Sequence, residues 1–562
     1  MTRRRFLGYF SAIGLSSTLM PGVLWSRVQE QEAPTVTLEM LEDAERLAGL
    51  SFTEEERQLM LRGLEEYLES YEALRAVELS NSVPPALYFN PVPPGTAVER
   101  PARPFRRSRV RVDGAPAELD ELAFWPVTRL AELIESRRVR SVDLTRMYMQ
   151  RLRTYGPKLE CVITVTEALA LEQARQADAE IAAGRYRGPL HGIPWGAKDL
   201  LAVPEHVTTW GARPYRDQRL EREATVVRRL EEAGAVMVAK LTLGALAWGD
   251  VWYGGRTRNP WNYEQGSSGS SAGSAAATAA GLVGFSIGSE TYGSIVSPST
   301  RCGTTGLRPT FGRVSRYGAM ALAWSMDKIG PICRGVEDCA LVLQAIQGPD
   351  GLDLSLFDIP FGWDPDIDIQ GLRVGYLKSA FEAERRDEEW AELDRRTLAA
   401  LEALGLELVP IELPDLPVGA MLFILYAEAA AAFDQLTRSD QDDLLVRQTR
   451  NAWPNVFRQS RLVPAVEYLQ ANRVRMLLMQ RMSDVMEQVD LYVTPSFGGS
   501  NLLLTNLTGH PCVVLPNGFR ANGTPTSISF VGRLFGEAEM MAVARAYQNA
   551  TGFHERHPEL QR

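Results

Sequence analysis

The side chains best suited to nucleophilic chemistry lie in a Gly- and Ser-rich stretch, residues 266–309, with one lysine, Lys198, upstream of it. The stretch reads GSSGSSAGSAAATAAGLVGFSIGSETYGSIVSPSTRCGTTGLRP. A segment of this composition standing alone is typical of a flexible linker. Here it runs into a helix-forming alanine run and then into the apolar segment 282–287, so we expect a loop held between elements of a core. Serine hydroxyls held in this way can attack a carbonyl carbon once a base has activated them.

Two other chemistries fit the same stretch less well. A phosphate-binding P-loop requires a lysine directly after its last glycine, and none is present there. The five residues Gly269–Gly273 formally match the G-x-S-x-G pattern of a nucleophile elbow. An elbow follows directly on a strand, whereas residues 259–268 are polar and turn-like, so the elbow is disfavoured.

Groups that take up a proton near neutral pH are scarce in this chain. Of 60 Lys and Arg residues only five are lysines, and there are five histidines. Because lysine has an ordinary pKa of about 10.4, removing its proton at pH 7 costs roughly 4.6 kcal/mol, and burial has to lower the pKa. Apolar residues flank Lys198 on both sides and predict an apolar setting for its ammonium group. The adjacent Asp199 would hold the proton in place, so we expect it to point elsewhere.

Histidine offers a competing mechanism. A Ser-His-Asp hydrolase needs one well-placed imidazole, and the candidates are His191 and His510. Each is more typical of a structural or pocket-wall residue. His554 and His557 have the i, i+3 spacing of a weak metal signature, but no further ligand cluster accompanies them. We therefore expect neither a metal nor a cofactor.

Several spaced motifs around these residues resemble the amidase signature family. Residues 192–199, GIPWGAKD, resemble the family's G-I-P-x-x-x-K-D, and residues 269–276, GSSAGSAA, resemble G-S-S-G-G-S-A-A. Residues 288–295, GSETYGSI, resemble G-T-D-T-G-G-S-I. Further matches lie at residues 257–261, 302–310, 312–318 and 506–511. The resemblance covers about residues 122–553, most of the chain.

By position, the resemblance implies a nucleophile at Ser294, a bridging serine with a cis peptide at Ser270 and a base at Lys198. In the implied mechanism, Lys198 takes the proton of Ser270 while Ser270 takes that of Ser294, which attacks the carbonyl and forms an acyl-enzyme. The implied fold is α/β, with a central mixed, twisted β-sheet covered by helices on both faces. The implied oxyanion hole consists of the backbone N–H groups of Thr291, Tyr292, Gly293 and Ser294.

Some positions depart from the commonest family pattern and bear on the substrate. Glu290 replaces an aspartate, Tyr292 a glycine and Val296 a frequent arginine. Tyr292 is expected either to narrow the acyl pocket or to point into the core. Together with Trp195 and Trp324 it suggests an apolar or aromatic acyl group, with a core role for the tryptophans as the alternative.

Two classes of function remain. The first is an amidohydrolase acting on a small-molecule linear amide, or on an ester or carbamate. The second is a non-catalytic assembly or binding subunit on the same fold, suggested by the altered residues 290–296 and by the helical hairpin predicted ahead of the catalytic domain. Retention of Lys198, Ser270 and Ser294 favours the enzyme. Amidotransferase A subunits place a glutamine-binding aspartate where this chain has Gly-Gly-Ser at residues 498–500. This difference argues against a tRNA-linked role. The sequence leaves open whether the protein forms a homodimer.

The N-terminus carries a predicted export signal. Residues 2–7, TRRRFL, resemble the twin-arginine pattern S/T-R-R-x-F-L, and a moderately apolar stretch follows through Trp25. We therefore expect a twin-arginine signal peptide over residues 1–33 and a periplasmic or extracellular protein that meets the membrane only during export. No clear A-x-A cleavage site follows, so an uncleaved membrane anchor is the alternative. The apolar segment 418–433 is too short to span a bilayer and predicts a buried helix.

Three further parts follow the signal. Residues 34–80 carry two amphipathic helical patterns, predict a helical hairpin, and resemble the C subunit of tRNA-dependent amidotransferases. Residues 81–117 are rich in proline and arginine without sustained periodicity, which is typical of a solvated linker. Residues 118–556 form the predicted catalytic domain.

Composition excludes several classes of protein. With 45% hydrophobic and 23% charged residues, the chain is expected to pack a large core. A net charge of −10 argues against a nucleic-acid partner, whose binding surface would be basic. Five cysteines without a CxxC motif are too few for a disulfide scaffold, and only Cys333 and Cys339 are close in sequence.

Overall fold

A computed structural model describes residues 36–49, 87–383 and 387–561, together with ten single positions between 51 and 81. The chain divides into two compact units, Met1–Ser80 and Asn81–Arg562. The predicted signal peptide, residues 1–33, lies outside the described residues.

The first unit contains helix α3, Leu38–Ala48. The Thr37 hydroxyl caps it by accepting a hydrogen bond of 3.2 Å from the Met40 N–H. Gly49 ends the helix in the left-handed region, with φ of 68°. Arg57 forms an ion pair of 3.0 Å with Glu45 of α3, which is buried. The first helix of the predicted hairpin is therefore present, whereas the second lies largely outside the described residues.

Within the described residues, the second unit is built on a mixed 11-stranded sheet. Strand β2 (Pro194–Lys198) runs parallel to β3 (Val236–Leu241) and to β8 (Phe285–Glu290), and β8 pairs antiparallel with β10 (Lys328–Cys333). The remaining strands are β1 (Val162–Val165), β9 (Thr305–Arg308), β11 (Val374–Leu377), β12 (Leu408–Ile411), β13 (Leu491–Pro495), β14 (Cys512–Phe519) and β15 (Pro525–Gly532). Their order is β1-β3-β2-β8-β10-β9-β14-β15-β13-β11-β12. Every residue of β2, β3 and β10 is buried, so this part of the sheet lies at the centre of the core.

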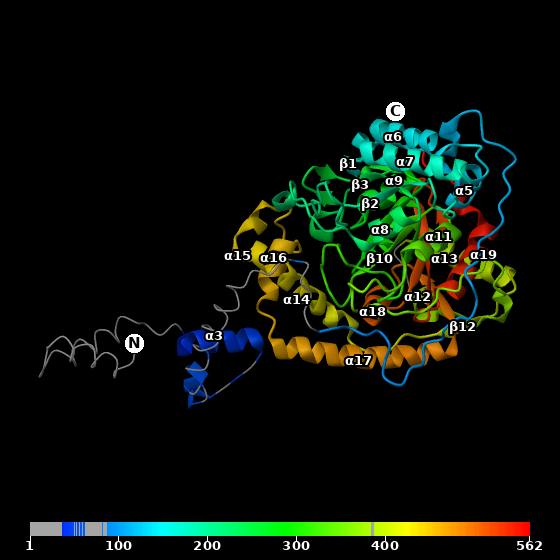
Figure 1. Ribbon diagram of the computed structural model, residues 1–562. Coiled ribbons are helices and arrows are strands. Elements are labelled where there is room, and N and C mark those ends of the chain that lie inside the picture. The colour runs from blue at the N-terminus through cyan, green and yellow to red at the C-terminus, as the bar shows by residue number, and fades with distance from the viewer. Residues whose placement is uncertain are drawn as a thin grey trace, which may run out of the picture. The chain divides into compact units, whose positions relative to one another are not determined.

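Helices surround this sheet (Figure 1), which confirms the predicted α/β fold. They are α5 (Val127–Glu135), α6 (Ser141–Leu159), α7 (Glu167–Ala182), α8 (Thr225–Glu232), α9 (Ala272–Ala279), α10 (Val296–Cys302), α11 (Val336–Ile346), α12 (Lys378–Glu382), α13 (Glu388–Ala403), α14 (Phe423–Ala432), α15 (Asp434–Arg438), α16 (Trp453–Ser460), α17 (Ala465–Gln488), α18 (Asn501–Thr508) and α19 (Glu537–Thr551). Two short hairpins, β4 (Val251–Trp252) with β5 (Gly255–Arg256) and β6 (Arg258–Asn259) with β7 (Asn262–Gly266), precede α9. Helix α9 is buried along its whole length because its small side chains let it lie close against the sheet.

Three sequence expectations about the core have clear outcomes. Trp195 is buried on β2 and its ring stacks 6.1 Å from that of Phe285, so it has the core role. The segment 418–433 folds as a short 3-10 turn followed by α14, with buried side chains such as Ile424 and Leu425. All five cysteines are free and buried, so Cys333 and Cys339 form no bridge. Among the described helices, none combines the length and apolarity needed to cross a membrane.

Over residues 87–117, which we call the strap, the predicted linker remains largely exposed but also makes specific contacts with the second unit. It has no helix or strand but follows the surface of the second unit (Figure 1). The Arg106 N–H donates to the Trp363 carbonyl at 2.8 Å, and the Arg106 guanidinium pairs with Asp364 at 2.9 Å. The Ser108 N–H donates to the Glu337 carboxylate at 2.7 Å. Prolines prevent regular structure here, while the polar side chains and backbone bind partners on the catalytic body.

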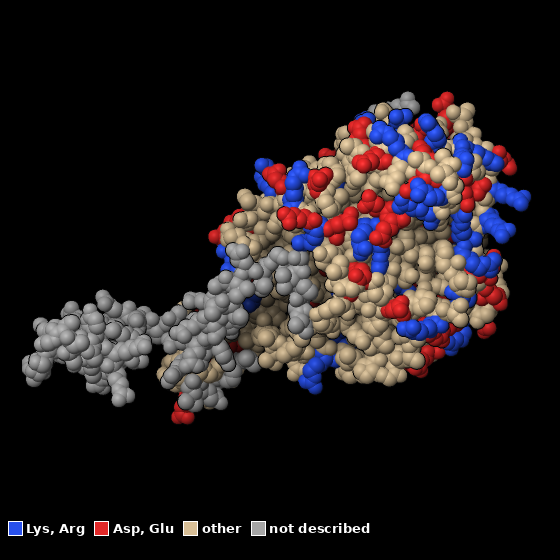
Figure 2. All heavy atoms as spheres, in the orientation of Figure 1, with Lys and Arg blue, Asp and Glu red and all other residues tan. Residues whose placement is uncertain are grey.

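Charged residues of both signs are intermixed on the face of the second unit shown in Figure 2. Charged side chains of this unit often pair locally, for example Arg396 with Glu392 at 3.0 Å and Arg438 with Asp434 at 2.6 Å.

Candidate active site

Lys198 is the last residue of β2, and its side chain is fully buried. The Nζ atom lies 2.8 Å from Ser270 Oγ, 2.9 Å from Ser271 Oγ and 2.9 Å from Ser289 Oγ. Ser289 belongs to β8, which pairs with β2, and Ser270 and Ser271 precede α9. The pairing of two neighbouring strands thus brings the lysine and the Gly/Ser-rich loop together.

Burial lowers the pKa of Lys198 to about 7, against the opposing effect of the carboxylates of Asp327 and Glu290. The sequence analysis also expected burial to lower this pKa, but its prediction of an apolar setting for the Lys198 ammonium group is wrong. Side chains alternate across a strand, so the apolar neighbours of Lys198 face away from its ammonium, which lies among serine hydroxyls. Asp199 points elsewhere, as predicted: its carboxylate pairs with Lys240 at 2.8 Å and accepts from the Thr209 N–H at 2.8 Å.

The loop that carries Ser270 lies against the loop that carries Ser294. The Ser271 N–H donates to the Ser294 carbonyl at 3.2 Å, and the Gly269–Ser270 peptide is cis, as the resemblance implied. Ser270 is buried, whereas Ser294 is half-buried. Among the described residues the Ser294 hydroxyl has no hydrogen-bond partner, so it is free to meet a substrate.

The segment between β8 and α10 presents free backbone donors. Gly293 adopts φ of 83°, a conformation that glycine accepts without strain. The N–H groups of Tyr292, Gly293 and Ser294 donate to no other group in the part of the chain that the structure describes. The Tyr292 side chain is 43% exposed, so the alternative in which it points into the core is wrong. This segment could hold a developing oxyanion.

The buried carboxylate of Glu290 holds the segment between β8 and α10 in place. Its carboxylate accepts hydrogen bonds from the N–H groups of Ile295 at 2.8 Å and Val296 at 2.9 Å. It also pairs with the buried Arg308 at 2.7 Å and accepts from the Asn506 amide at 2.8 Å. Burial alone would raise the pKa of Glu290, but Arg308 and these donors hold it at about 2. The carboxylate is therefore charged at neutral pH and fixes the turn that follows Ser294.

Asp327 is a second carboxylate that binds the segment between β8 and α10. The Thr291 hydroxyl donates to Asp327 at 2.6 Å, and the carboxylate also accepts from the N–H groups of Leu322 at 2.8 Å and Ala323 at 3.0 Å. Burial raises the pKa of this carboxyl group. Asp327 thus links the predicted oxyanion segment to the loop before β10.

Sequence reasoning missed several of these residues. Ser271, Ser289 and Arg308 lie inside the quoted motifs, so the motifs themselves carried a signal that was not read as function. Glu290 was singled out only as a departure from the family pattern. Asp327 lies in none of the quoted motifs, and nothing in its local sequence indicated its role.

The histidines do not take part in this site. His191 is buried, and its Nδ1 accepts from the Arg187 N–H at 3.1 Å. His510 bonds to the Thr508 hydroxyl at 2.8 Å, and burial lowers its pKa to about 3. The His557 ring stacks 4.0 Å from that of Phe124. Across the described ranges, no group of three or more His, Cys, Asp or Glu residues is arranged to hold a metal ion.

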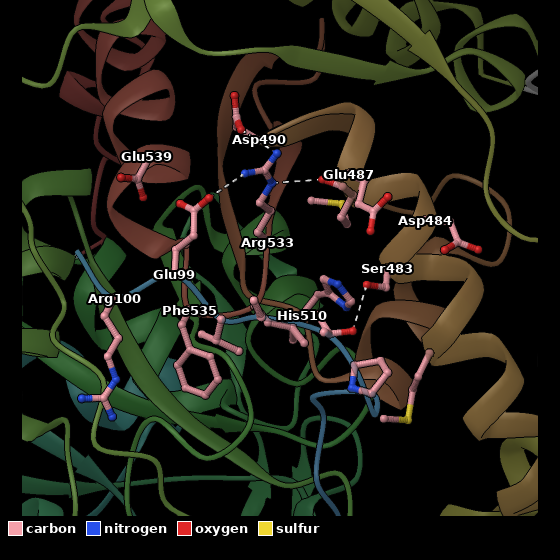
Figure 3. Close-up of a pocket in the computed structure, with 18 of the residues that line it drawn as sticks. Glu99, Arg100, Ser483, Asp484, Glu487, Asp490, His510, Arg533, Phe535 and Glu539 are labelled. Carbon is pink, nitrogen blue, oxygen red and sulfur yellow. Dashed lines mark hydrogen bonds and ion pairs between the residues drawn. The ribbon is translucent and has the colours of Figure 1, made fainter.

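Two cavities lined by described residues differ in their relation to the site. A cavity of about 330 Å³, which we call the side cavity, is lined by Ser289, Thr291 and Asp327, and also by Trp324. A larger cavity of about 990 Å³ lies between the strap and α17 (Figure 3). Its charged groups pair with one another, as Arg533 does with Asp490 at 2.8 Å, and it contains none of the predicted catalytic residues. The chemistry therefore points to the side cavity.

Burial lowers the pKa of Lys198 to about 7, its Nζ atom bonds to Ser270, and the loop of Ser294 with its free backbone donors lies alongside. Such an arrangement is chemically able to activate a serine hydroxyl. The chain belongs to the amidase family: the family's sequence model, described as Amidase, matches residues 143–504. The protein is an amidohydrolase that cleaves C–N amide bonds.

Known proteins similar to this chain include amidotransferase A subunits and amidases. The A subunit of the glutamyl-tRNA(Gln) amidotransferase from Moorella thermoacetica is 35% identical over 489 residues, which cover 78% of this chain and 99% of that protein. The peptide amidase of Stenotrophomonas maltophilia shares the fold with a TM-score of 0.70 and 28% identity, covering 79% of this chain and 100% of that one. An amidase family protein from Bacillus anthracis has a TM-score of 0.69 and 25% identity, covering 79% and 94%. The resemblance of residues 34–80 to a C subunit stays a prediction.

Proposed function

We propose that the protein is an exported amidase that hydrolyses carboxylic amides through an acyl-enzyme, with Ser294 as nucleophile, Ser270 as relay and Lys198 as base. The observation that carries this proposal is the 2.8 Å contact between Lys198 Nζ and Ser270 Oγ inside a buried site. A lysine whose pKa is about 7 is neutral often enough at physiological pH to accept a proton.

The reaction proceeds in two halves. Neutral Lys198 takes the proton of Ser270 while Ser270 takes that of Ser294, whose Oγ forms a bond to the carbonyl carbon. The backbone N–H groups of residues 292–294, with that of Thr291, stabilise the oxyanion. The C–N bond then breaks as Ser270 gives its proton to the leaving amine and takes one back from protonated Lys198, which becomes neutral again. Water adds to the acyl-enzyme by the same relay, releasing the acid and restoring Ser294.

The chain departs from its amidotransferase relatives in the place where glutamine would bind. Gly498, Gly499 and Ser500 offer no carboxylate to an amino group, so glutamine is disfavoured as the substrate. The apolar and aromatic lining of the side cavity, with Trp324, instead suits a substrate carrying an apolar group.

A non-catalytic subunit on the same fold is the alternative. It was suggested by the altered residues Glu290, Tyr292 and Val296. Because Glu290 holds two backbone N–H groups beside Ser294, the substitution keeps the loop in a defined conformation, which supports a working enzyme. The relatives' names as subunits allow a protein partner, and neither this nor a homodimer conflicts with catalysis.

Assays of the purified full chain test the activity. Wild-type protein should release ammonia or amine from a panel of aryl, alkyl and peptide C-terminal amides faster than from glutamine. Esters and carbamates belong in the same panel. Activity confined to glutamine in the presence of an aminoacyl-tRNA would contradict the proposal.

Export is tested separately. The double substitution Arg3→Lys with Arg4→Lys should retain the protein in the cytoplasm, since the pattern S/T-R-R-x-F-L depends on both arginines. Arg5→Lys, at the variable position, is the matched control and should leave export intact. Equal fractionation of the double variant and wild type into the periplasm would contradict twin-arginine export.

A further inference from the structure

We infer that the strap is part of the substrate site: Leu87, Tyr88 and Phe89 form one wall of the side cavity, and this cavity takes an apolar group on the amine side of the substrate amide. The inference rests on the proposed hydrolytic function. It concerns a segment that lies before residue 143, where the family match begins.

The side cavity lies next to Lys198, the proposed base, because hydrogen-bonded neighbours of the catalytic groups line it. Ser289 and Thr291 line it, and Ser289 Oγ lies 2.9 Å from Lys198 Nζ. Thr291 donates to Asp327, which also lines the cavity. A substrate group in the cavity would therefore lie next to Ser289, whose hydroxyl is hydrogen-bonded to the catalytic lysine.

The cavity lies on the side of the leaving group. Ser270, which returns a proton to the leaving amine, bonds to the same Nζ atom as Ser289. Of the four proposed oxyanion donors only Thr291 lines the cavity, whereas Tyr292, Gly293 and the nucleophile Ser294 do not. We therefore assign the space beside Ser289 to the amine substituent.

Several of the apolar side chains that line the side cavity are exposed at its mouth. Tyr88 is 57% exposed, and Leu354 is 69% exposed. Further exposed apolar side chains at the mouth are those of Leu87, Tyr317 and Leu352. Apolar side chains gathered in the open around a cavity are typical of a binding site. An aryl or alkyl substituent on the amide nitrogen would cover them.

Phe89 in the strap and Asn81, which precedes the strap, are both bound to the rest of the second unit. The Asn81 side-chain amide donates to the Ala321 carbonyl at 2.9 Å, and the Ala321 N–H donates to the Asn81 amide oxygen at 2.8 Å. The Phe89 ring packs edge-on against Phe311 at 5.0 Å, and the Arg475 guanidinium lies 3.7 Å from its centroid. Phe89 therefore anchors the wall next to Leu87 and Tyr88, as a specificity pocket requires.

Matched substrates test the inference on the full chain. Acetanilide and acetamide share an acyl group and differ on the amine side, whereas benzamide and acetamide share the amine and differ on the acyl side. In Tyr88→Ala and Leu87→Ala, the ratio of kcat/KM for acetanilide over acetamide should fall about tenfold, the size expected for lost apolar contact. The benzamide over acetamide ratio should stay as in wild type. Leu469→Ala on α17, also 57% exposed and outside the cavity, is the control and should change neither ratio.

Three results would overturn the inference. Unchanged ratios in both strap variants would exclude the strap from the site. A fall in the benzamide ratio instead would place the acyl group in the cavity. Wild-type protein that hydrolyses none of these amides while still active on glutamine would contradict the proposed function and the inference with it.

Discussion

Lys198 has to be neutral to accept a proton, and its surroundings decide at which pH that happens. Burial lowers its pKa to about 7, while Asp327 and Glu290 act in the opposite direction. Three serine hydroxyls surround the Nζ atom and can solvate either form of the amine. The residue is therefore a base suited to neutral pH, although nothing about the chemistry of lysine alone would make it one.

The pH dependence of catalysis follows from this pKa. We expect kcat/KM to rise about tenfold per pH unit below pH 7 and to level off above it, with an apparent pKa of about 7. Lys198→Arg should abolish turnover, because guanidinium keeps its proton. Steady-state rates on a neutral amide between pH 5 and 9 check both. An acid limb centred above pH 9, or an active arginine variant, would contradict the role of Lys198.

Because its pKa is lowered in the folded chain, Lys198 reduces the free energy of unfolding at neutral pH. Its pKa is about 7 in the folded chain and 10.5 ordinarily, so between these values the unfolded chain binds more protons and stability rises with pH. Relative to Lys198→Met, wild type should gain about 2 kcal/mol in free energy of unfolding between pH 7 and pH 9. Urea unfolding of both proteins at the two pH values measures this. A difference that does not change with pH would mean that the lysine titrates normally.

Among the elements, β8 and the turn after it do most to place the site. Strand β8 supplies Ser289 to Lys198 and ends at Glu290, whose carboxylate fixes the N–H groups of Ile295 and Val296. A buried ion pair of 2.7 Å joins Glu290 to Arg308 at the end of β9. The nucleophile segment is therefore positioned by a charged pair in the core of the sheet.

This arrangement predicts a specific defect in Glu290→Gln. Removing one charge leaves Arg308 buried without its partner and should cost about 3 to 5 kcal/mol of stability. The loosened turn should also lower kcat about 100-fold, with a smaller effect on KM. Glu537→Gln is the matched control, because Glu537 pairs with Arg313 at 2.7 Å and both are equally buried. It should lose similar stability but keep the kcat of the folded enzyme; equal loss of kcat in both would contradict a positioning role for Glu290.

The sequence predicted the elements better than their contacts. The motifs around Lys198, Ser270 and Ser294 placed the base and the relay serine in the same site, because spacing that repeats a family pattern carries the fold with it. The apolar setting expected for Lys198 failed because neighbours along a strand face opposite ways. Asp327 could not have been found, since its contacts come from chain folding and not from local sequence.

At the scale of the whole molecule, the boundary between the two units falls before Asn81, and the strap belongs to the catalytic body. A chain starting at Asn81 keeps the contacts of Arg106 and Ser108, whereas one starting at Glu118 loses them. We expect the first to unfold at nearly the wild-type temperature and the second to unfold several degrees lower. Thermal unfolding followed by circular dichroism compares them. Identical melting of the two truncated chains would mean that the strap contributes nothing to stability.

The central claim is that Ser294 is the nucleophile activated through Ser270 and Lys198. Labelling with a fluorophosphonate followed by peptide mapping tests it most directly, because the reagent marks only an activated serine. The account predicts one adduct on Ser294 in wild type, strongly reduced labelling in Lys198→Arg and none in Ser294→Ala. An adduct on another serine, or one that persists in Ser294→Ala, would contradict it.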